Sequence, residues 1–505
     1  MQNHNFYQLF SQACEKAGDD PLLITEQNQP YSYTEIDALA ARLANTLLDL
    51  GVGIGDRVSV KVNKSPEALC LYLACLRAGF VFHPLNPAYQ ANELEYFLHN
   101  AEPAILVCED KELSAIEPIA SATGVKQLLT LNTDGSGSLL DRAKSNSAKF
   151  TTVACKADDL AALLYSSGTT GVPKGIKLSH QNLSSNAKVL TQAWGFTEQD
   201  ILLHALPIFH VHGLFVALGC VICSVASMRW LPAFKAELVI EYLPQCTVMM
   251  GVPTFYTRLL DAPGFSQDVC QNMRLFISGS APLLEETFKQ FEDRTGHRIL
   301  ERYGMTETNM NTSNPLDGER KPGTVGPPLP GVEIRISDTQ NHSLPNGEIG
   351  NLQVRGNNVF KGYWRMPDKT AEDFTADGFF NTGDQGIIDQ DGYVAIVGRS
   401  KDLIITGGLN VYPKEIELII DKIDGVKESA VIGAPHADFG ECVVAVIVPE
   451  PGASVEENDI INQLKNQIAN FKVPKQVVII DELPRNTMGK VQKNILRKNH
   501  HMLLA

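Results

Sequence analysis

The chain has 505 residues, a formal net charge of -15 and 44% hydrophobic residues. This length allows two or three domains, and the composition is typical of a globular protein that builds its own core. The negative charge excludes a nucleic-acid duplex or an anionic membrane surface as the main partner, because either would be repelled. Any anionic substrate must therefore be met by local positive groups.

Cysteine usage and the N-terminal residues indicate a cytoplasmic protein. Ten cysteines are scattered along the chain without the dense spacing of a disulfide scaffold, which favours a reducing compartment. Residues 1–20 contain neither a signal-peptide nor a transit-peptide pattern. The most apolar segment, 213–228, is shorter than the roughly 20 residues that span a bilayer, so we expect a buried helix and no membrane span. Its Cys220 and Cys223 are interpreted as two packed thiols, because no second pair follows to complete a zinc site.

Helices and strands alternate in the N-terminal part. Apolar residues at helical spacing predict a helix over 32–50, with a capping box formed by Ser32 and Glu35. A strand over 57–62, a helix over 65–78 and a strand over 80–85 continue the alternation, which is typical of an α/β sheet. From about residue 320 to residue 398, turn residues separate short strands, which predicts a β-rich subdomain.

The C-terminal part has a different pattern. Helices are predicted near 413–422 and 460–468, with strands near 428–432, 443–448 and 476–480, an order that suits a compact α+β domain. We therefore expect the α/β class: a large N-terminal domain of layered α/β sheets (1–398) that contains the β-rich subdomain, a hinge at 399–402, and a small mobile α+β domain over 403–505.

A glycine- and hydroxyl-rich run at 165–176, YSSGTTGVPKGI, is the most informative segment. Glycine lets the backbone approach a ligand closely, the hydroxyls add donors, and Lys174 adds a positive charge. An apolar strand over 160–165 precedes the run and a helix from residue 182 follows it, an arrangement in which phosphates commonly bind. The run is not the usual P-loop, because Lys174 precedes Gly175 and Ile176 follows. It predicts a loop for a nucleoside triphosphate, with a flexible surface turn as the alternative.

Four further motifs accompany this loop: 301–308 (ERYGMTET), 381–386 (NTGDQG), 398–403 (GRSKDL) and 486–490 (NTMGK). In this order and spacing the chain resembles the acyl-adenylate-forming (AMP-binding) enzymes over essentially its whole length. Its closest likeness among them is to malonyl-CoA synthetases, through 251–260 (GVPTFYTRLL) and 301–314. The resemblance implies a ligase that uses ATP, Mg2+ and coenzyme A: a carboxylate attacks the α-phosphate to give acyl-AMP and pyrophosphate, and the CoA thiol then displaces AMP. Malonate, or methylmalonate, is the implied acid.

The resemblance also implies roles for individual residues. Lys490 is the expected catalytic lysine, because an ammonium beside the attacking carboxylate offsets the charge that gathers at phosphorus. Thr306 is expected to hold phosphate oxygens and Glu307 to bind Mg2+, a hard cation that prefers oxygen ligands. Lys401 matches the hinge, and Gly407 and Gly408 match the CoA path. The expected nucleotide contacts are Ser166, Ser167, Gly168, Thr169, Thr170, Gly171, Lys174, Gly279, Ser280, Ala281, Arg302, Tyr303, Gly304, Met305, Thr306, Asp384 (on the ribose) and Arg399.

The acid pocket of such an enzyme needs a cation if the substrate is a short dicarboxylate. Arg258 is the expected cation, because a guanidinium offers a carboxylate paired N–H donors; an ordinary surface arginine is the alternative. His210, Ser280 and Met305 are expected to line the pocket, and Arg274 is a weaker candidate for the cation.

Other functions stay open at this point. The same motifs occur in ligases for other short- or medium-chain acids and in luciferase-like monooxygenases. A carrier-loading module is disfavoured because no carrier domain fits the chain, and a noncatalytic relative would be expected to lack Lys490 or Glu307. Family behaviour also suggests that a lysine acetyltransferase and a deacetylase regulate Lys490, since acetylation removes its charge.

Overall fold

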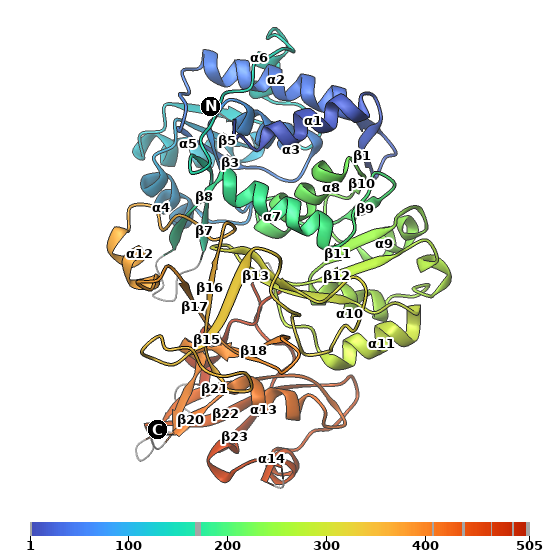
Figure 1. Ribbon diagram of the computed structural model, residues 1–505, viewed down its shortest axis with the longest axis vertical. Helices are drawn as coiled ribbons and strands as arrows, with labels where there is room; N and C mark the ends of the chain where they lie inside the picture. Colours follow the sequence, from blue (N-terminus) through green and yellow to red (C-terminus); the bar gives the residue numbers. More distant parts are fainter. Residues whose placement is uncertain are drawn as a thin grey trace. The chain divides into compact units, whose positions relative to one another are not determined.

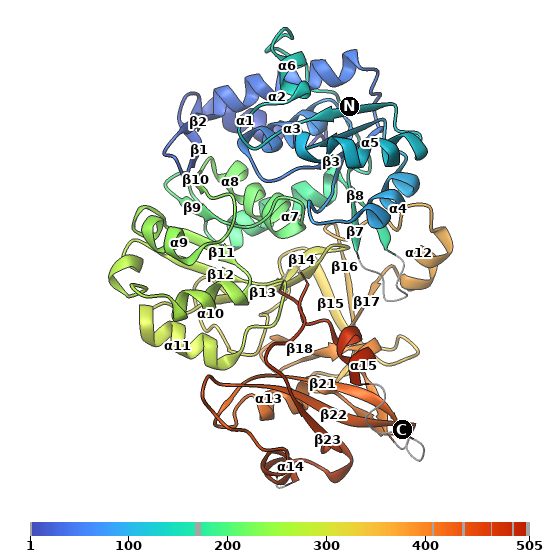
Figure 2. The ribbon, with the colours of Figure 1, turned by 180° about the vertical axis from the view of Figure 1, so that it is seen from behind.

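The computed structural model describes residues 3–166, 173–406, 409–436, 440–465, 467–486 and 489–500. The chain divides into two compact units: unit 1 comprises residues 1–333 and 355–374, and unit 2 comprises 334–354 and 375–505. Figures 1 and 2 show the elements of both units from opposite sides.

Unit 1 contains, among its described residues, a six-stranded sheet in the order β6-β5-β3-β4-β7-β8. Its strands are β3 (Arg57–Lys61), β4 (Val81–Pro84), β5 (Ile105–Cys108), β6 (Gln127–Thr130), β7 (Leu160–Ser166) and β8 (Lys174–Ser179). All neighbouring strands are parallel except β7 and β8. The helices of this part are α1 (Tyr7–Ala17), α2 (Tyr33–Asp49), α3 (Pro66–Arg77), α4 (Ala91–Ala101), α5 (Leu113–Ala122) and α6 (Ser138–Ala143).

The predicted alternation of helices and strands in this part is confirmed. Helix α2 begins where expected, because the Ser32 side chain accepts a hydrogen bond from the Glu35 N–H and the Glu35 carboxylate accepts one from the Ser32 N–H. Helix α3 is capped by Ser65, and every residue of the helix is buried. Helices α1, α2 and α3 lie together in Figure 1, with α3 between the others and the sheet.

A second sheet of unit 1 has eight strands among the described residues, in the order β14-β13-β12-β11-β9-β10-β1-β2. These are β1 (Pro21–Thr25), β2 (Pro30–Ser32), β9 (Ile201–His204), β10 (Ser227–Trp230), β11 (Val248–Gly251), β12 (Leu275–Ser278), β13 (Leu300–Met305) and β14 (Asn309–Ser313). Within this order, the neighbouring strands β13, β12, β11, β9, β10 and β1 are parallel to one another. At the two edges, β2 and β14 pair antiparallel with their neighbours. Further helices are α7 (His180–Ala193), α8 (Leu218–Ser224), α9 (Ala236–Tyr242), α10 (Pro253–Asp261), α11 (Glu285–Thr295) and α12 (Pro367–Asp373).

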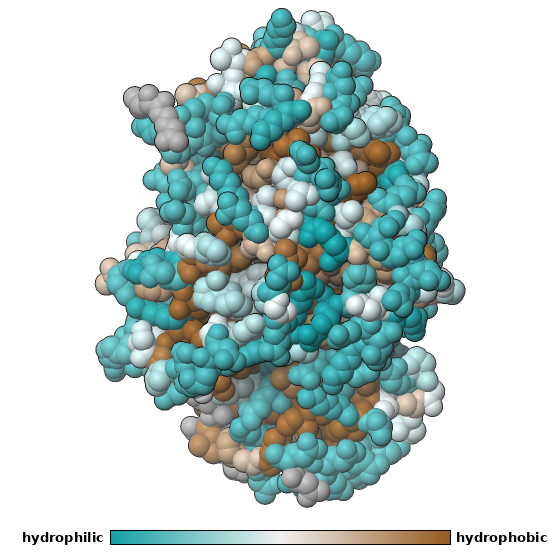
Figure 3. Space-filling view, turned by 45° about the vertical axis from the view of Figure 1, so that its right-hand side comes forward, coloured by the Kyte–Doolittle hydropathy of each residue, from teal (hydrophilic) through white to brown (hydrophobic). Residues whose placement is uncertain are grey.

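The apolar segment 213–228 is only partly the helix that we expected. It forms a π-helix over His212–Ala217, continues as α8 and ends in strand β10. The polar residues within this apolar segment do not mark the position at which the helix ends and the strand begins. Within the described part of the chain, no helix is both long and apolar enough to cross a membrane, and the face seen in Figure 3 is mostly hydrophilic, with hydrophobic residues between.

Unit 2 holds two sheets among its described residues. One has the order β15-β16-β17-β18, formed by β15 (Val332–Ser337), β16 (Gly350–Gly356), β17 (Phe380–Ile388) and β18 (Val394–Arg399). The other contains β19 (Ile404–Thr406), β20 (Leu409–Val411), β21 (Val426–His436), β22 (Gly440–Pro449) and β23 (Gln476–Ile479). Its helices are α13 (Pro413–Ile420), α14 (Glu457–Lys465) and α15 (Lys493–His500).

The β21–β22 sheet is covered by apolar side chains on both faces. Ile416 and Ile420 of α13 pack with Leu464 of α14 on one face. Leu483 and Leu496 pack on the other, so the chain around residue 490 crosses this second face. The α/β class, with a β-rich part and a small α+β part, is confirmed, whereas the boundaries at 398 and 402 stay a prediction.

Candidate active site

The glycine-rich run connects two paired strands. Strand β7 ends at Ser166, which lies directly opposite Lys174, the first residue of the antiparallel strand β8. Helix α7 begins only after β8, at His180. The predicted strand before the run and the predicted helix after it are present, but the direct step from loop to helix is wrong, because Lys174–Ser179, with buried Ile176 and Leu178, form an additional strand. The run is anchored by a hairpin instead of a helix N-terminus.

Five predicted phosphate contacts cannot be placed. Ser167, Gly168, Thr169, Thr170 and Gly171 lie outside the described residues. Their roles stay a prediction, and the described residues of this loop are those at its two ends.

Lys174 is a buried cation with a carboxylate nearby. Its side chain is 9% exposed, and its Nζ lies 3.9 Å from Oδ2 of Asp373 and 4.9 Å from the ring centroid of Tyr363. Asp373 is more tightly engaged elsewhere, because it accepts a hydrogen bond of 3.0 Å from the Tyr363 hydroxyl and pairs with Lys369 at 2.9 Å. The Lys174 ammonium is thus held in place by a longer contact and keeps capacity for a second anion.

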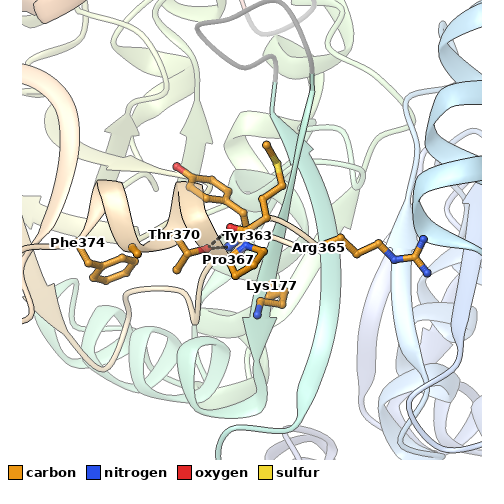
Figure 4. A pocket seen from close by; sticks show the side chains of 8 residues that line it. Lys177, Tyr363, Arg365, Pro367, Thr370 and Phe374 are labelled. Carbon is orange, nitrogen blue, oxygen red and sulfur yellow. Dashed lines mark hydrogen bonds between the residues drawn. The ribbon is translucent and has the colours of Figure 1, made fainter.

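A cavity of about 410 Å³ lies beside α12 (Figure 4). It is lined by Lys177, Tyr363, Arg365, Met366, Pro367, Thr370, Ala371 and Phe374. In Figure 4 the Arg365 side chain extends away from the cavity, and its Nη1 donates a hydrogen bond of 2.8 Å to Glu102. The lining is therefore mainly apolar and contains no residue that the sequence predicted for the site.

Glu307 and Ser166 come together from distant segments. Glu307 follows strand β13, is 7% exposed, and its Oε1 accepts a hydrogen bond of 3.4 Å from the Ser166 hydroxyl. Thr306, beside it, is half-buried. Carboxylate and hydroxyl oxygens are ligands that Mg2+ prefers, and one carboxylate is enough when substrate phosphates supply others. No cluster of three or more His, Cys, Asp or Glu side chains suited to a metal occurs in the described residues.

Several other predicted residues follow two neighbouring parallel strands at their carboxyl ends. Gly279, Ser280 and Ala281 follow β12, and Arg302, Tyr303, Gly304 and Met305 are the last residues of β13. The carboxyl ends of parallel strands lie at one edge of a sheet, where α/β proteins commonly bind ligands. The Tyr303 hydroxyl lies 4.0 Å from the Met305 sulfur.

His212 connects the π-helix to this edge. Its Nδ1 lies 3.3 Å from the Ser280 hydroxyl oxygen, and Ser280 has the left-handed φ of 72°. Burial, and then the positive charge of Arg302, lower the pKa of His212 well below its usual value, so the ring is neutral near pH 7. The sequence leaves a pocket-lining role open for both His210 and His212 and assigns only His210 to the acid pocket, whereas the structure brings His212 to Ser280. His210 is half-buried two residues earlier.

Arg302 is a buried guanidinium beside the same residues. It is 2% exposed, and a side-chain carbon added to Gly279 would lie only 2.4 Å from its Cζ. Within the described part of the chain, its Nε and Nη2 have no hydrogen-bond partner. Burial lowers the pKa of Arg302 to about 10, which still leaves it charged at neutral pH. A buried cation with unused donors is costly unless an anion reaches it.

Arg258 and Arg274, the two arginines predicted as candidates for the acid anchor, differ in their surroundings. Arg258 is exposed in the last turn of α10. Arg274 pairs with Asp200 through two contacts of 2.7 and 2.8 Å, and it also donates to the Trp194 carbonyl at 3.1 Å. Its donors are used in a structural ion pair, so the weaker candidate for the acid anchor loses its support.

Unit 2 brings Asp384 and Arg399 together. They lie opposite each other on β17 and β18, with Arg399 Nε 3.2 Å from Asp384 Oδ1, and Asp384 is 5% exposed. Lys401 is exposed in a short 3-10 turn after β18. Gly407 and Gly408 lie outside the described residues. Lys490 is half-buried in a turn between β23 and α15.

The fold and this distribution of polar residues agree with comparisons to known proteins. Residues 10–364 match the family model for AMP-binding enzymes, and residues 415–490 match the model for the C-terminal domain of these enzymes. The chain belongs to the AMP-binding enzyme family, which confirms the resemblance found in the sequence.

Individual relatives are ligases. The chain is 34% identical to a malonate–CoA ligase of Arabidopsis thaliana, over 99% of this chain and 90% of that protein. It is 32% identical to a mitochondrial malonate–CoA ligase of Homo sapiens, over 95% of this chain and 90% of the relative. The crystal structure of ATP-bound MatB from Rhodopseudomonas palustris superposes with a TM-score of 0.96 at 53% identity, covering 100% of both chains.

Proposed function

We propose that the protein is an ATP-dependent malonate–CoA ligase. It adenylates malonate with release of pyrophosphate and then transfers the malonyl group to CoA, giving malonyl-CoA and AMP. The observation that carries the choice of acid is the buried Arg302 guanidinium, which has two unused donors and whose charge helps to keep His212 neutral. A fatty-acyl chain would leave this cation unpaired, whereas the second carboxylate of a short diacid would pair with it. The two malonate–CoA ligase relatives support the same choice.

The first half-reaction requires positive charge and oxygen ligands around the phosphates. Lys174 is a buried cation that can offset phosphate charge, and Thr306 and the loop hydroxyls add donors. Glu307 and Ser166 supply the oxygens that fit Mg2+, and the bound ion would neutralise charge on the triphosphate. Lys490 stabilises the developing charge during adenylation, and Lys401 is the hinge.

Two groups of residues are proposed to contact the nucleoside. Asp384, oriented by Arg399, accepts hydrogen bonds from the ribose hydroxyls. The segments 279–281 and 303–305 contact the adenine, and Met305 and His210 also limit the acid pocket. Gly407 and Gly408 keep their predicted place on the CoA path.

The acid is anchored by Arg302, with exposed Arg258 as a second contact. A guanidinium binds a carboxylate through two parallel N–H donors. This changes the role predicted for Arg302, because its burial beneath Gly279 suits an anion better than an adenine ring.

The function is tested by measuring pyrophosphate release with malonate, methylmalonate, succinate, acetate and octanoate, each with and without CoA. We expect the highest kcat/KM with malonate, and malonyl-CoA formation only when CoA is added. A preference for acetate or octanoate contradicts the malonate assignment. Oxygen consumption linked to product formation would indicate a monooxygenase instead.

Two regulatory and cellular properties complete the proposal. Acetylation of Lys490 by a lysine acetyltransferase, reversed by a deacetylase, removes its charge and stops adenylation; unchanged activity in a fully acetylated sample contradicts this. The ten cysteines are free thiols, most of them buried, which supports the predicted cytoplasmic location. Localisation of the tagged protein in cells tests it.

A further inference from the structure

Lys490 lies at the end of a turn that is closed by backbone hydrogen bonds. Asn486 N donates to the Lys490 carbonyl at 2.9 Å, and Gln492 N donates to the Pro484 carbonyl at 2.7 Å. Lys490 N in turn donates to Oδ1 of Asn486 at 3.0 Å. Gly489 has a φ of 74°, a left-handed conformation that glycine adopts without a steric penalty. These bonds hold residues 484–486 and 489–492 together.

Arg485 connects this segment to strand β21. Its Nη1 donates a hydrogen bond of 2.7 Å to the carbonyl of Gly489, the residue before Lys490. Its Nη2 donates to the carboxylate of Glu428, which lies on strand β21. The two side chains are 26% and 19% exposed, so the pair is less screened by water than a surface pair. One guanidinium thus joins the strand to the backbone next to Lys490.

Apolar side chains pack on either side of the turn. Leu483 before the turn and Leu496 after it are buried against the face of the β21–β22 sheet, with Val491 packed beside them. An antiparallel bridge pairs Arg485 with Val491. The residues that flank the turn are therefore held by apolar contacts, and the Arg485 guanidinium adds a polar contact at Gly489.

We propose that Arg485 and Glu428 are positioning residues for Lys490. The inference rests on the proposed function, in which Lys490 acts in adenylation only. Without the guanidinium, the Gly489 carbonyl loses this donor and the backbone next to Lys490 is held less firmly. A smaller fraction of molecules then presents the ammonium to the α-phosphate, and small misplacements of a catalytic group lower rates strongly.

The role predicts unequal effects on the two half-reactions. Arg485→Met is expected to slow pyrophosphate release from ATP and malonate at least about tenfold. The same variant should convert supplied malonyl-AMP and CoA to malonyl-CoA within about twofold of the wild type, because Lys490 is not used in that step. Glu428→Gln should slow adenylation less, since the Gly489 contact remains. Arg485→Lys should recover part of the rate, because one ammonium keeps the charge but not the two directed contacts.

The experiment measures both half-reactions separately for the wild type, these variants, Lys490→Ala and a matched control, Lys472→Met. Lys472 forms a similar ion pair in unit 2, 2.6 Å from Glu415 with side-chain exposures of 23% and 39%, on a different part of the unit. The control should leave both rates within about twofold of the wild type.

The possible failures are distinguishable. Equal losses in both assays for Arg485→Met, or an unchanged adenylation rate, overturn the positioning role. Normal pyrophosphate release by Lys490→Ala overturns the role of Lys490 itself. A wild-type protein that performs neither half-reaction with malonate contradicts the proposed function.

Discussion

Arg302 is the residue whose environment says most about the substrate. It is a cation that the fold buries almost completely, and two of its donor nitrogens have no partner in the described part of the chain. A hydrogen bond to a charged group is worth about 1.5–3 kcal/mol. We therefore expect Arg302→Met to raise KM for malonate about 10- to 100-fold and to leave KM for ATP nearly unchanged.

Initial-rate kinetics with each substrate varied in turn check this prediction. Arg258→Ala should also impair malonate turnover more than ATP binding, as the sequence predicted. Arg294→Met, at an exposed position on α11, is the control and should change neither constant. Equal increases in KM for malonate and ATP in Arg302→Met would show a general disruption of the edge at β12 and β13.

Individual residues also mark the limit of prediction from the sequence. The motif carrying Glu307 was recognised, and its contact with Ser166 joins two motifs that the sequence only placed in order. The inward position of His212 depends on a π-helix, whose hydrogen-bond pattern has no residue preference strong enough to read. The burial of Arg302 depends on the absence of a side chain at Gly279, a contact between strands that sequence spacing does not encode.

Helices and strands with strong local signals were predicted well. The capping box of α2 is present because Ser32 and Glu35 satisfy each other's backbone N–H groups, which requires only local sequence. Strand β8 was missed, because its pairing with β7 determines its conformation more than its own six residues do.

The cap of α2 gives a prediction about stability. Ser32→Ala removes the acceptor of the 3.1 Å hydrogen bond from Glu35 N, and loss of such a cap costs about 1 kcal/mol. We expect a lower midpoint of urea unfolding, with unchanged kinetics in the absence of urea. Ser32→Asp, which keeps an acceptor, is the control and should unfold near the wild-type midpoint.

Helix α13 ends at a carboxyl group that predicts a pH effect. Burial raises the pKa of Asp421 to about 6, above that of an unfolded aspartate, so the folded protein holds this proton more tightly. The free energy of unfolding therefore falls as pH rises from about 4 to about 6 and stays lower above that range. Asp421→Asn removes this effect and can still accept the hydrogen bond from Ser429.

Thermal unfolding at pH 4.5 and pH 7.5 measures this pH dependence of stability. Asp421→Asn should gain more stability relative to the wild type at pH 7.5 than at pH 4.5. The neighbouring Asp424→Asn, at an exposed position, should show no such difference. A larger gain at the acidic pH would contradict the direction of the pKa shift.

At the scale of the whole molecule, the net charge of -15 is opposed locally by buried cations such as Lys174 and Arg302. The proposed residues are divided between the two units, and the hinge prediction states that the small domain over 403–505 turns about Lys401 for the second half-reaction. Proline restricts backbone rotation at φ. Lys401→Pro should therefore slow one half-reaction at least about tenfold and leave the other within about threefold.

The same two assays, pyrophosphate release and conversion of supplied malonyl-AMP, measure this effect. Lys401→Ala, which keeps backbone freedom, is the control and should retain both activities. Equal losses in Lys401→Pro would remove the support for a hinge at this position.

The turn that carries Lys490 has a consequence for how such enzymes diverge. All of its described contacts, from Arg485 and Glu428 to the leucines packed on the β21–β22 sheet, come from unit 2, whereas Arg302, His212 and Ser280 belong to unit 1. Lys490 and its supporting contacts therefore lie within one contiguous stretch of the chain, 428–496. Substrate preference and the support of Lys490 can then change through separate mutations.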